Sequence, residues 1–546
     1  MLAARPALRE GDLEPRLTAM HDPSGIPDLD RAAGMLLADL AEGRTIAIYG
    51  DYDVDGATAS AILHHALKGL DPGARLLHYV PHRTREGYGL HAHALEELAS
   101  EGARTVVTVD CGITAREPAR RARELGLALI ITDHHNPPAR LDELPPADAV
   151  VHPRRPDSEY PFEHLCGAGV AFKLAWRLAT MAGGARAMPE MRRLLLDLLP
   201  LAALGTVADV MKLVGENRAI VAHGVAMLRG TRVRGLAALA ERCTKPGEPI
   251  RASDLGFRLG PRINALGRVA DAAAAVELLT TDDAARIEPI LAEMDRLNGQ
   301  RQAIEKRIVE EAARLAEDAG MHRDERRAIV LAHEDWHPGV IGIACSRLVE
   351  RYGRPTILLQ RDGDICRGSG RSIPGFNLHA ALGECGEHLL SFGGHDAAAG
   401  LALASDRLDA FADAFTAATN RDIEVDDLMP TLSIDAEAQL PELTVDAVAQ
   451  LDRLAPFGMG NPAPRVLVRG VRVAQPPTLM GAGGGHLSIV VGQDDAAVRL
   501  VGWNWGRHAE RLRAASRLDA VLVPKVETFR GTTAVRGEIA DARLIP

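Results

Sequence analysis

Short apolar runs alternate with amphipathic segments over the first part of the chain. The segments between the runs, such as Ala57–Leu67 and Arg116–Leu125, carry apolar residues at helical spacing. Buried strands that alternate with helices are typical of βα units around a mainly parallel sheet. The pattern therefore predicts an α/β lobe, followed by helices from Ala168 to Ala208. The predicted strands are Thr45–Tyr49, Leu76–Val80, Thr105–Val109, Leu127–Thr132 and Ala147–Val151.

The rest of the chain changes pattern twice. The charged segment Asp283–Ala319 has no Pro after Pro289, which predicts one long helix linking two lobes. A second α/β region then follows, with strands at Ala328–Leu331 and Thr356–Leu359 and a helix at Ile341–Tyr352. From about residue 430, β-rich runs separated by Gly and Asp predict a small closed or sandwich β domain. These runs are Arg465–Val473, His486–Val491, Val498–Trp503 and Ala520–Val526.

Composition narrows the class of protein. A chain of 546 residues is too long for one hydrophobic core. No signal peptide and no membrane-spanning apolar run is found, and the six Cys form no CxxC pair, so we expect a cytoplasmic protein without disulfides or zinc ribbons. The net charge of −11 gives no support to a nucleic-acid partner. It does not exclude one, because bound metal and local Arg clusters can offset it.

The strongest chemical signal is the run Tyr49-Gly50-Asp51-Tyr52-Asp53-Val54-Asp55-Gly56. In an extended segment Asp51, Asp53 and Asp55 would point to one side, at the carboxyl end of a buried strand. A calcium loop of the EF-hand type is excluded, because the twelfth position is Ile62 rather than Glu. A solvated acidic turn is the alternative. Three acids and a Gly directly after a buried strand favour a metal site over that alternative.

Metal-capable residues also follow the next two central strands. Asp110 follows Thr105–Val109, and Asp133-His134-His135 follows Leu127–Thr132. The carboxyl ends of neighbouring parallel strands meet at one edge of a sheet, so these residues should lie together. Oxygen-rich ligation with one imidazole suits manganese or magnesium better than zinc.

These motifs, with Gly205-Thr206-Val207-Ala208-Asp209-Val210, resemble the motif series of DHH phosphoesterases. The resemblance implies two divalent ions, manganese or magnesium, that activate water and neutralise a phosphoryl group. It places Asp53 and Asp110 on one ion and Asp55, Asp110, His134 and Asp209 on the other. Asp51 and Asp133 would support the ligands, and His135 would face substrate phosphate. Tyr49 stands where relatives carry His, which leaves one ligand of the first ion open to water or Asp51.

Further stretches resemble the RecJ branch of that family, from about Ile46 to the C-terminus. His152 and Lys212 depart from the pattern, and neither is expected to touch a ligand. The matching stretches are Tyr79–Arg83, Gly87–Leu90, Cys166–Lys173, Gly260–Arg268, Trp336–Gly342, Gly368–Ser372, Ser391–His395 and Pro456–Pro462.

The RecJ resemblance implies contacts with a polyanion. Ser369 and Arg371 would hold a terminal 5′ phosphate, helped by a Gly-rich turn at Gly368–Gly370, although an ordinary turn is the alternative. His395 would reach the scissile phosphate from the second lobe. Further candidate phosphate contacts are Arg83, Arg262, Asn264 and Arg268, each Arg having a structural ion pair as its alternative. Trp503 and Trp505 would stack bases in an OB-fold, unless they are core residues.

The resemblance also implies a domain order and a function. We expect an N-terminal extension (1–40), a DHH domain (41–255), a connecting region with the long helix (256–322), a DHH-associated domain (323–425) and an OB-like domain (426–546). The expected activity is 5′→3′ exonuclease hydrolysis of single-stranded DNA to mononucleotides in repair and recombination. The expected protein is a monomer, with a single-stranded DNA-binding protein and a RecQ-type helicase as partners. Alternatives are a phosphodiesterase for cyclic dinucleotides or very short RNA, and a non-catalytic scaffold in a replication complex.

Overall fold

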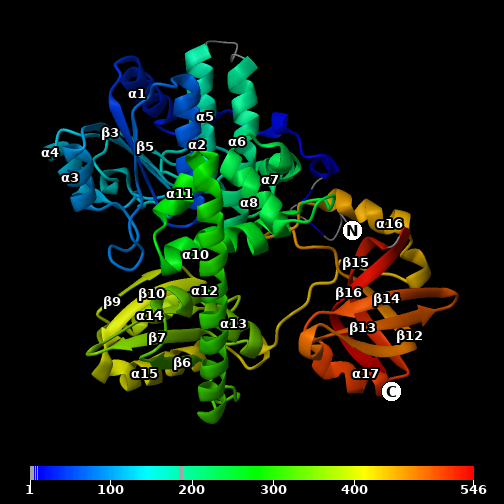
Figure 1. Cartoon of the computed structure of the whole chain (residues 1–546). Helices are drawn as coiled ribbons and strands as arrows, with labels where there is room; N and C mark the ends of the chain where they lie inside the picture. The colour runs from blue at the N-terminus through cyan, green and yellow to red at the C-terminus, as the bar shows by residue number, and fades with distance from the viewer. Residues whose placement is uncertain (1–4, 6–7, 9, 184–188, 530, 546) are drawn as a thin grey trace.

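The computed structural model describes residues 10–183, 189–529 and 531–545, together with Arg5 and Leu8. Figure 1 shows a lobe with a parallel sheet, a long helix leading to a second lobe, and a separate β domain at the C-terminal end. Within these ranges, no helix combines the length and the apolar character needed to cross a membrane.

The first lobe contains a five-stranded parallel sheet in the order β2-β1-β3-β4-β5. Every predicted strand of this region forms, and the predicted parallel sheet is confirmed. Side chains of β1 alternate between two cores: Ile46 and Ile48 lie in one, Ala47 and Tyr49 in the other. The strands are β1 (Thr45–Gly50), β2 (Leu76–Tyr79), β3 (Ala103–Val109), β4 (Ala128–Thr132) and β5 (Ala149–Val151).

Helices cover both faces of this sheet. Helices α1, α2, α5 and α6 supply the core that contains Ile46, whereas α3 and α4 supply the core that contains Tyr49. Their bounds are α1 (Leu29–Ala41), α2 (Val54–Leu70), α3 (Ala92–Ser100), α4 (Arg116–Glu124), α5 (Gly167–Gly183) and α6 (Pro189–Ala208).

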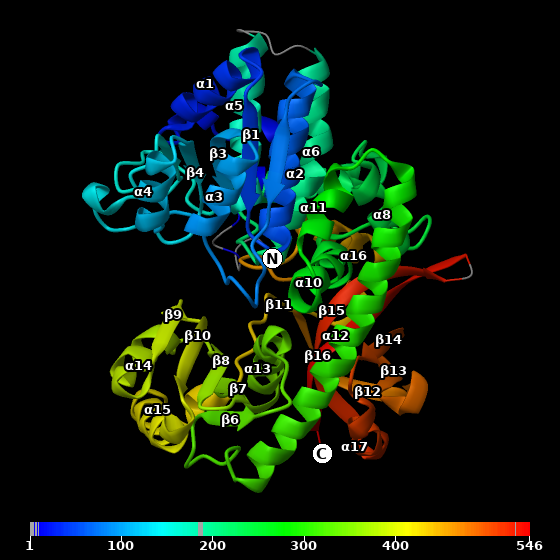
Figure 2. The same cartoon turned by 60° about the vertical axis from the view of Figure 1, so that its left-hand side comes forward.

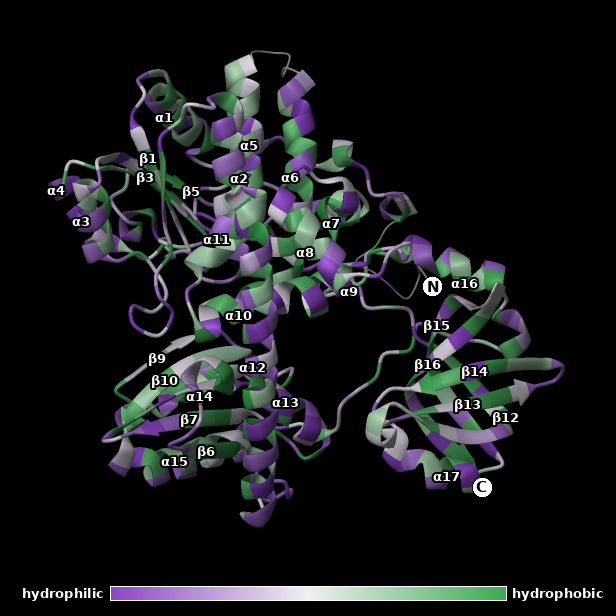
Figure 3. Cartoon of the chain, viewed as in Figure 1, coloured by the Kyte–Doolittle hydropathy of each residue, from purple (hydrophilic) through white to green (hydrophobic). Residues whose placement is uncertain are grey.

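A helical region leads from the first lobe to the second. The predicted long helix is confirmed as α12 (Ala284–Asp318), which is 35 residues long. Figure 3 shows hydrophilic residues along most of its lower half. The preceding helices are α7 (Gly215–Met227), α8 (Arg234–Cys243), α9 (Ala252–Asp254), α10 (Gly260–Val269) and α11 (Ala273–Thr280).

The second lobe contains a mixed sheet in the order β6-β7-β8-β10-β9. The predicted strands β6 and β7 and helix α13 are present, but the other three strands were not predicted. Its elements are β6 (Ile329–His333), α13 (Pro338–Tyr352), β7 (Thr356–Asp362), β8 (Ile365–Arg371), α14 (Leu378–Glu384), β9 (Ser391–Gly394), β10 (Ala398–Ala404) and α15 (Leu408–Asp422).

The predicted Gly-rich turn at Gly368–Gly370 is wrong. These residues lie inside β8, where they pair with β7 on one side and β10 on the other. A Cβ on Gly368 would lie 2.1 Å from the carbonyl oxygen of Leu358, so glycine permits close strand approach there. The backbone N–H groups of a strand paired on both sides serve the ladder and do not form a phosphate cradle.

The C-terminal domain is a closed β barrel, as one of the two sequence alternatives predicted. Its sheet runs β11-β12-β13-β14-β16-β15, and pairing of β12 with β15 closes it. Strands β11 and β16 were not predicted. The bounds are β11 (Ala436–Glu437), α16 (Val445–Leu451), β12 (Val466–Met480), β13 (His486–Gln493), β14 (Ala496–Gly502), α17 (Ala509–Ala514), β15 (Arg517–Phe529) and β16 (Thr532–Ile545).

Two buried arginines hold the segment that enters the barrel. Arg218 of α7 is 1% exposed and donates hydrogen bonds to the carbonyl oxygens of Asp12 (2.7 Å), Leu454 (2.9 Å) and Ala455 (2.7 Å). Arg5 donates to Asn461 Oδ1 at 2.6 Å. Buried carbonyl groups need such partners. The N-terminal segment and α7 therefore fix the segment that leads into the β domain.

Candidate metal centre

The first acidic group occupies the turn between β1 and α2. Strand β1 ends at Gly50, and α2 begins at Val54 with Asp53 as its N-cap residue. Asp53 Oδ1 accepts hydrogen bonds from the N–H groups of Asp55 (2.8 Å) and Gly56 (3.1 Å). The prediction that Asp51, Asp53 and Asp55 lie along one side of an extended segment is therefore wrong. Helix capping bends the segment, so Asp55 comes from the first helical turn.

The predicted metal ligands nevertheless converge. The potential ligand atoms of Asp51, Asp53 and Asp110 lie within 4.8 Å of one another, and so do those of Asp55, His134 and Asp209. His134 Nε2 lies 3.1 Å from Asp110 Oδ1, 3.6 Å from Asp209 Oδ2 and 3.7 Å from Asp55 Oδ2. Asp110 thus adjoins both groups, at the carboxyl end of the central strand β3.

Buried polar atoms at the centre lack hydrogen-bond partners. Asp51 Oδ1, Asp110 Oδ1 and His134 Nε2 are all in this state, which is unusual for buried groups. Burial, together with the charge of Asp55, raises the pKa of Asp110 well above its ordinary value. Burial lowers the pKa of His134 to about 3, so its imidazole is neutral and able to bind a metal. The cluster therefore fits divalent cations, which would relieve the carboxylate repulsion.

The start of α5 supports both groups of ligands. The backbone N–H groups of Gly167 and Ala168 donate to the Asp55 carboxylate at 2.6 and 2.9 Å. A Cβ on Gly167 would lie only 2.5 Å from Cβ of Asp110. Glycine is therefore needed where α5 meets Asp110.

Replacing Gly167 with alanine should lower metal-dependent hydrolysis by about 100-fold or more, because a displacement of about 1 Å is enough for such a loss. Steady-state rates at several manganese concentrations measure the effect. Gly34→Ala is the matched control, because Gly34 lies in α1 and its nearest neighbouring atom would be 3.9 Å from the new Cβ. Equal rates for Gly167→Ala and Gly34→Ala would contradict the assigned packing.

Asp133 supports the neighbouring histidines through hydrogen bonds. It accepts from the N–H groups of Ile113 (2.9 Å) and His134 (2.7 Å) and lies 2.8 Å from His135 Nδ1. Burial opposes the charged form of His135, but the hydrogen bond and charge of Asp133 outweigh it and raise the pKa of His135 to about 9. The hydrogen bond to Asp133 therefore favours the charged imidazole of His135, which can donate to an anion.

Tyr49 is turned away from the cluster. Its ring stacks on Tyr79 at 5.1 Å, and its hydroxyl donates to the carbonyl oxygen of Gly89 at 2.8 Å. Water and Asp51 are the two candidates for the missing ligand of the first ion. The carboxylate of Asp51 lies close enough to those of Asp53 and Asp110 to bind the same ion. The geometry thus favours Asp51 over water as this ligand.

Three of the predicted phosphate-binding arginines share one region. The charges of Arg83 and Arg371 both act on Arg268, and burial together with these charges lowers the pKa of Arg268 to about 9. A Cβ on Gly342 would lie 3.1 Å from Arg371 Nη2 and 3.3 Å from Ser369 Oγ, so Arg371 and Ser369 lie against the same helix. Like charges gathered in this way are costly unless an anion binds between them.

Other predicted residues take different positions. Arg262 forms an ion pair with Asp295 of α12 at 2.7 Å. This is the structural ion pair that was the alternative to phosphate binding for this residue. His395 of the second lobe has its Nδ1 3.1 Å from Asn136 Nδ2, in the loop that follows His135. Figures 1 and 2 show the segment between β2 and α3 extending from the first lobe toward the second.

The two tryptophans, predicted to stack bases unless they are core residues, lie outside the strands of the barrel. Strand β14 ends at Gly502, so both lie in the turn that follows it. Trp503 is 49% exposed, with its ring edge-on to His486. Trp505 packs against the barrel core. Trp503 is therefore available for stacking, and Trp505 is mainly a packing residue.

Three residues near the centre were not assigned a role from the sequence. The hydroxyl of Tyr88 lies 2.9 Å from His135 Nδ1 and donates to the carbonyl oxygen of Asp110 at 3.3 Å. Arg154 donates to the carbonyl oxygen of His134 at 2.7 Å. His152, expected to stay clear of the ligands, lies 2.7 Å from the carbonyl oxygen of His135. For Tyr88, the position between Gly87 and Gly89 was the one sequence signal that could have indicated a role at the site.

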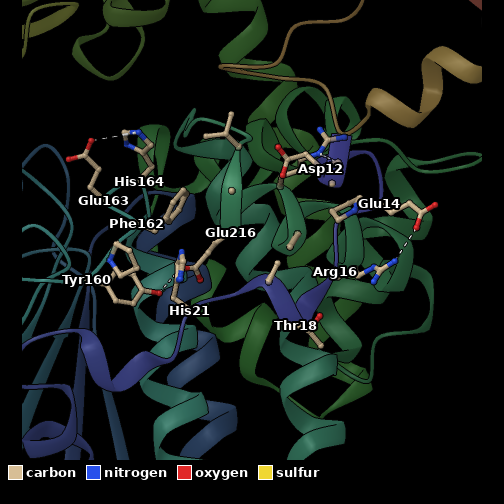
Figure 4. Close-up of a pocket in the computed structure, with 18 residues that line it drawn as sticks. Asp12, Glu14, Arg16, Thr18, His21, Tyr160, Phe162, Glu163, His164 and Glu216 are labelled. Atoms are coloured by element: carbon tan, nitrogen blue, oxygen red, sulfur yellow. Dashed lines mark hydrogen bonds and ion pairs between the residues drawn. The ribbon is translucent and has the colours of Figure 1, made fainter. Parts of the chain in front are cut away.

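A cavity of about 870 Å³ lies elsewhere, between the N-terminal segment, the loop around Tyr160 and the start of α7. Figure 4 shows Tyr160 and Glu216 close together, and the hydroxyl of Tyr160 donates to Glu216 at 2.6 Å. Other charged residues in its wall pair locally, as Arg16 does with Glu14 at 3.4 Å. No predicted site residue lines this cavity, so its size does not mark the reactive centre.

Comparison with known proteins agrees with this arrangement. Residues 45–206 match the family described as "DHH family, N-terminal domain", residues 325–421 match "DHHA1 domain" and residues 434–541 match "RecJ OB domain".

Curated relatives are named single-stranded-DNA-specific exonuclease RecJ. The relative from Bacillus subtilis is 37% identical over 92% of this chain, and the chain spans 61% of that relative's length. The relative from Dickeya dadantii is also 37% identical, over 85% of this chain and 82% of its own length. A crystal structure of RecJ from Thermus thermophilus in complex with Mn²⁺ matches with a TM-score of 0.82 and 32% identity, covering 98% of this chain and 74% of that one.

Proposed function

This chain belongs to the RecJ family, and we propose that it is a metal-dependent exonuclease that digests single-stranded DNA from the 5′ end to mononucleotides. The observation that carries this proposal is the meeting of Asp51, Asp53, Asp55, Asp110, His134 and Asp209 at one edge of the sheet. Loss of ligands would mark a non-catalytic scaffold, and every predicted ligand is present. The matched OB domain counts against the cyclic-dinucleotide and short-RNA alternative.

Two divalent ions, manganese or magnesium, are the cofactors that these residues fit. We assign Asp53, Asp110 and Asp51 to one ion, and Asp55, Asp110, His134 and Asp209 to the other. When bound, such ions neutralise phosphoryl charge and acidify water. Asp133 would hold His135 toward the scissile phosphate, with His395 approaching from the second lobe.

The same family membership supports the remaining proposals. We propose the five-part division at residues 40, 255, 322 and 425, with the α12 connection between the DHH domain and the DHH-associated domain and with the barrel as a separate domain. We propose a cytoplasmic monomer that receives its strand from a single-stranded DNA-binding protein and a RecQ-type helicase. Repair and recombination are the processes in which such a nuclease would act.

A parallel assay tests the proposed function. The purified chain and manganese are incubated with 5′-labelled single-stranded DNA, duplex DNA, a short oligoribonucleotide and a cyclic dinucleotide. The proposal predicts release of labelled mononucleotide from the single strand alone. Preferential hydrolysis of the cyclic dinucleotide or the oligoribonucleotide would overturn it, and so would the absence of hydrolysis of every substrate.

Replacing Arg371 with alanine should remove most of the preference for a 5′-phosphorylated end over a 5′-hydroxyl end. Loss of a charge-assisted hydrogen bond to phosphate should lower the preference for the phosphorylated end by about 10-fold or more. The ratio of kcat/KM for the two ends measures it. Arg421→Ala is the matched control, because Arg421 is exposed and pairs with Glu384 and Asp422. If Arg371→Ala keeps the ratio of the unaltered protein, another residue binds the terminal phosphate.

A further inference from the structure

The contact between His395 and Asn136 joins the two lobes beside the metal centre. His395 lies in the turn between β9 and β10, and Figure 2 shows these strands on the side of the second lobe that faces the first. Asn136 belongs to the loop that follows His134 and His135. Asn136 Nδ2 and His395 Nδ1 lie 3.1 Å apart, although 259 positions of sequence separate the two residues. The contact therefore depends on how one lobe lies against the other.

The backbone of His395 is fixed by a tight turn. Its N–H group donates to the carbonyl oxygen of Ala398 at 2.8 Å, and the N–H group of Ala398 donates to the carbonyl oxygen of His395 at 3.3 Å. Gly394, directly before it, has a φ of 139°, which favours glycine. A Cβ on Gly394 would also lie 2.4 Å from the carbonyl oxygen of Ala398. The turn thus sets the position of His395, and its neighbours set the protonation of the ring.

Arg154 determines which way the amide of Asn136 faces. Its Nη2 donates to the carbonyl oxygen of His134 at 2.7 Å and to Asn136 Oδ1 at 3.2 Å. A guanidinium has donors only, so the atom that faces it must be the amide oxygen. The reverse orientation of the amide would place two donors against each other. The amide nitrogen of Asn136 consequently faces His395.

The amide in turn determines the tautomer of His395. An amide nitrogen only donates, so His395 Nδ1 must accept and cannot carry a proton. The neutral imidazole then carries its proton on Nε2. A doubly protonated ring would place the Nδ1–H group against the amide N–H, so the contact also favours the neutral ring.

The charged neighbours of His395 act in the same direction. Burial and the charges of His135 and Arg154, both from the first lobe, lower the pKa of His395. Within the second lobe, His379 of α14 also lowers this pKa, whereas the carboxylate of Asp396 raises it. The net direction is downward, so the ring is mainly neutral at neutral pH.

We infer that Arg154 and Asn136 are positioning residues that keep the Nε2–H group of His395 available as a hydrogen-bond donor to the scissile phosphate. The inference rests on the proposed function, because the phosphate belongs to the substrate strand. The imidazole donates from Nε2 whether it is neutral or protonated, since Asn136 excludes the other neutral tautomer. Donation to a phosphoryl oxygen stabilises the charge on that oxygen during hydrolysis.

The tautomer can be measured directly and without substrate. The full-length protein with magnesium is labelled with nitrogen-isotope histidine, and long-range proton–nitrogen spectra at mildly alkaline pH show which ring nitrogen carries the proton. The signals of His395 are those lost in His395→Gln. We expect the proton on Nε2 alone in the unaltered protein and a proton on Nδ1 in Asn136→Asp, because a carboxylate only accepts. A protonated Nδ1 in the unaltered protein would overturn the inference, and so would an Nδ1 signal that the substitution leaves unchanged.

The pH dependence of cleavage tests what the tautomer does. In Asn136→Asp the new carboxylate raises the pKa of His395, and the neutral ring carries its proton on Nδ1. Nε2 then donates only below that pKa. The ratio of kcat for Asn136→Asp to kcat for the unaltered protein should therefore fall about 10-fold or more as the pH rises through it. The substrate is 5′-phosphorylated single-stranded DNA, measured from about pH 6 to about pH 9.

Two controls separate this effect from the added charge. The double variant Asn136→Asp with His395→Gln has no ring to titrate, so its rate relative to His395→Gln alone should not depend on pH. Asn420→Asp adds the same charge to α15 of the second lobe and should also give a ratio that does not depend on pH. A pH-independent ratio for Asn136→Asp itself would overturn the inference while the nuclease assignment stands. If the unaltered protein cleaves no single strand, the proposed function fails and the inference with it, even where the spectra show the expected tautomer.

Discussion

Replacing Asp110 with alanine is expected to reduce single-stranded DNA hydrolysis by at least about 10⁴-fold while leaving the fold intact. Asp110 adjoins both groups of ligands, so its loss affects both ions. Burial raises the pKa of this carboxylate, and the charges of Asp55, Asp53, Asp51 and Asp209 raise it further. Removing it relieves repulsion in the metal-free protein, so unfolding stability should not fall.

Single-turnover cleavage of end-labelled DNA measures the loss, and titration calorimetry with manganese measures binding. We expect the number of ions bound per chain to fall together with the rate. Asp324→Ala is the control, because Asp324 is exposed and contacts Arg354 at 3.6 Å. Activity of Asp110→Ala within about tenfold of the unaltered protein would exclude a bridging role for this residue.

The location of the metal centre could be predicted because it depends on topology. Buried parallel strands are almost continuously apolar in sequence, so β1, β3 and β4 were evident. Their carboxyl ends meet by the geometry of the sheet, which places Asp110 and His134 together. The arrangement of Asp51, Asp53 and Asp55 could not be predicted in the same way. Strand alternation and helix capping compete there, and capping by Asp53 prevails.

Contacts between distant segments explain what the sequence did not reveal. Arg262 and Arg268 lie on the same helix, yet Asp295 pairs with Arg262 and no described carboxylate pairs with Arg268. Their sequence surroundings do not indicate this difference, because the partner comes from α12. Tyr88 likewise reaches His135 across 47 positions of sequence.

Glycine-containing strands were the weakest part of the fold prediction. Strand β8 contains Gly368 and Gly370, which resemble turn residues in sequence. Strand β9 ends in a glycine pair, with Gly394 at a φ of 139°. Glycine signals a turn or a close approach of backbones equally well, and the approach of Leu358 to Gly368 is visible only in three dimensions.

Replacing Lys173 with methionine should lower the free energy of unfolding by about 3–5 kcal/mol, because it leaves a buried carboxylate without its counter-charge. Lys173 is fully buried in α5 and forms an ion pair with Glu216, which is 1% exposed. The ammonium also donates to the carbonyl oxygen of His21 at 2.8 Å and lies 4.9 Å from the ring centre of Trp176. Denaturant unfolding followed by tryptophan fluorescence measures the loss.

The double variant Lys173→Met with Glu216→Gln separates lost charge from lost packing. The Gln amide oxygen can still accept a hydrogen bond from the hydroxyl of Tyr160, and no isolated charge remains. Most of the lost free energy of unfolding should therefore return. Lys245→Met is the surface control, since its exposed pair with Glu248 should change stability by less than about 0.5 kcal/mol. A double variant as unstable as Lys173→Met alone would show that packing, and not the unpaired carboxylate, causes the loss. Lys173 would then act as a spacer between α5 and the N-terminal segment.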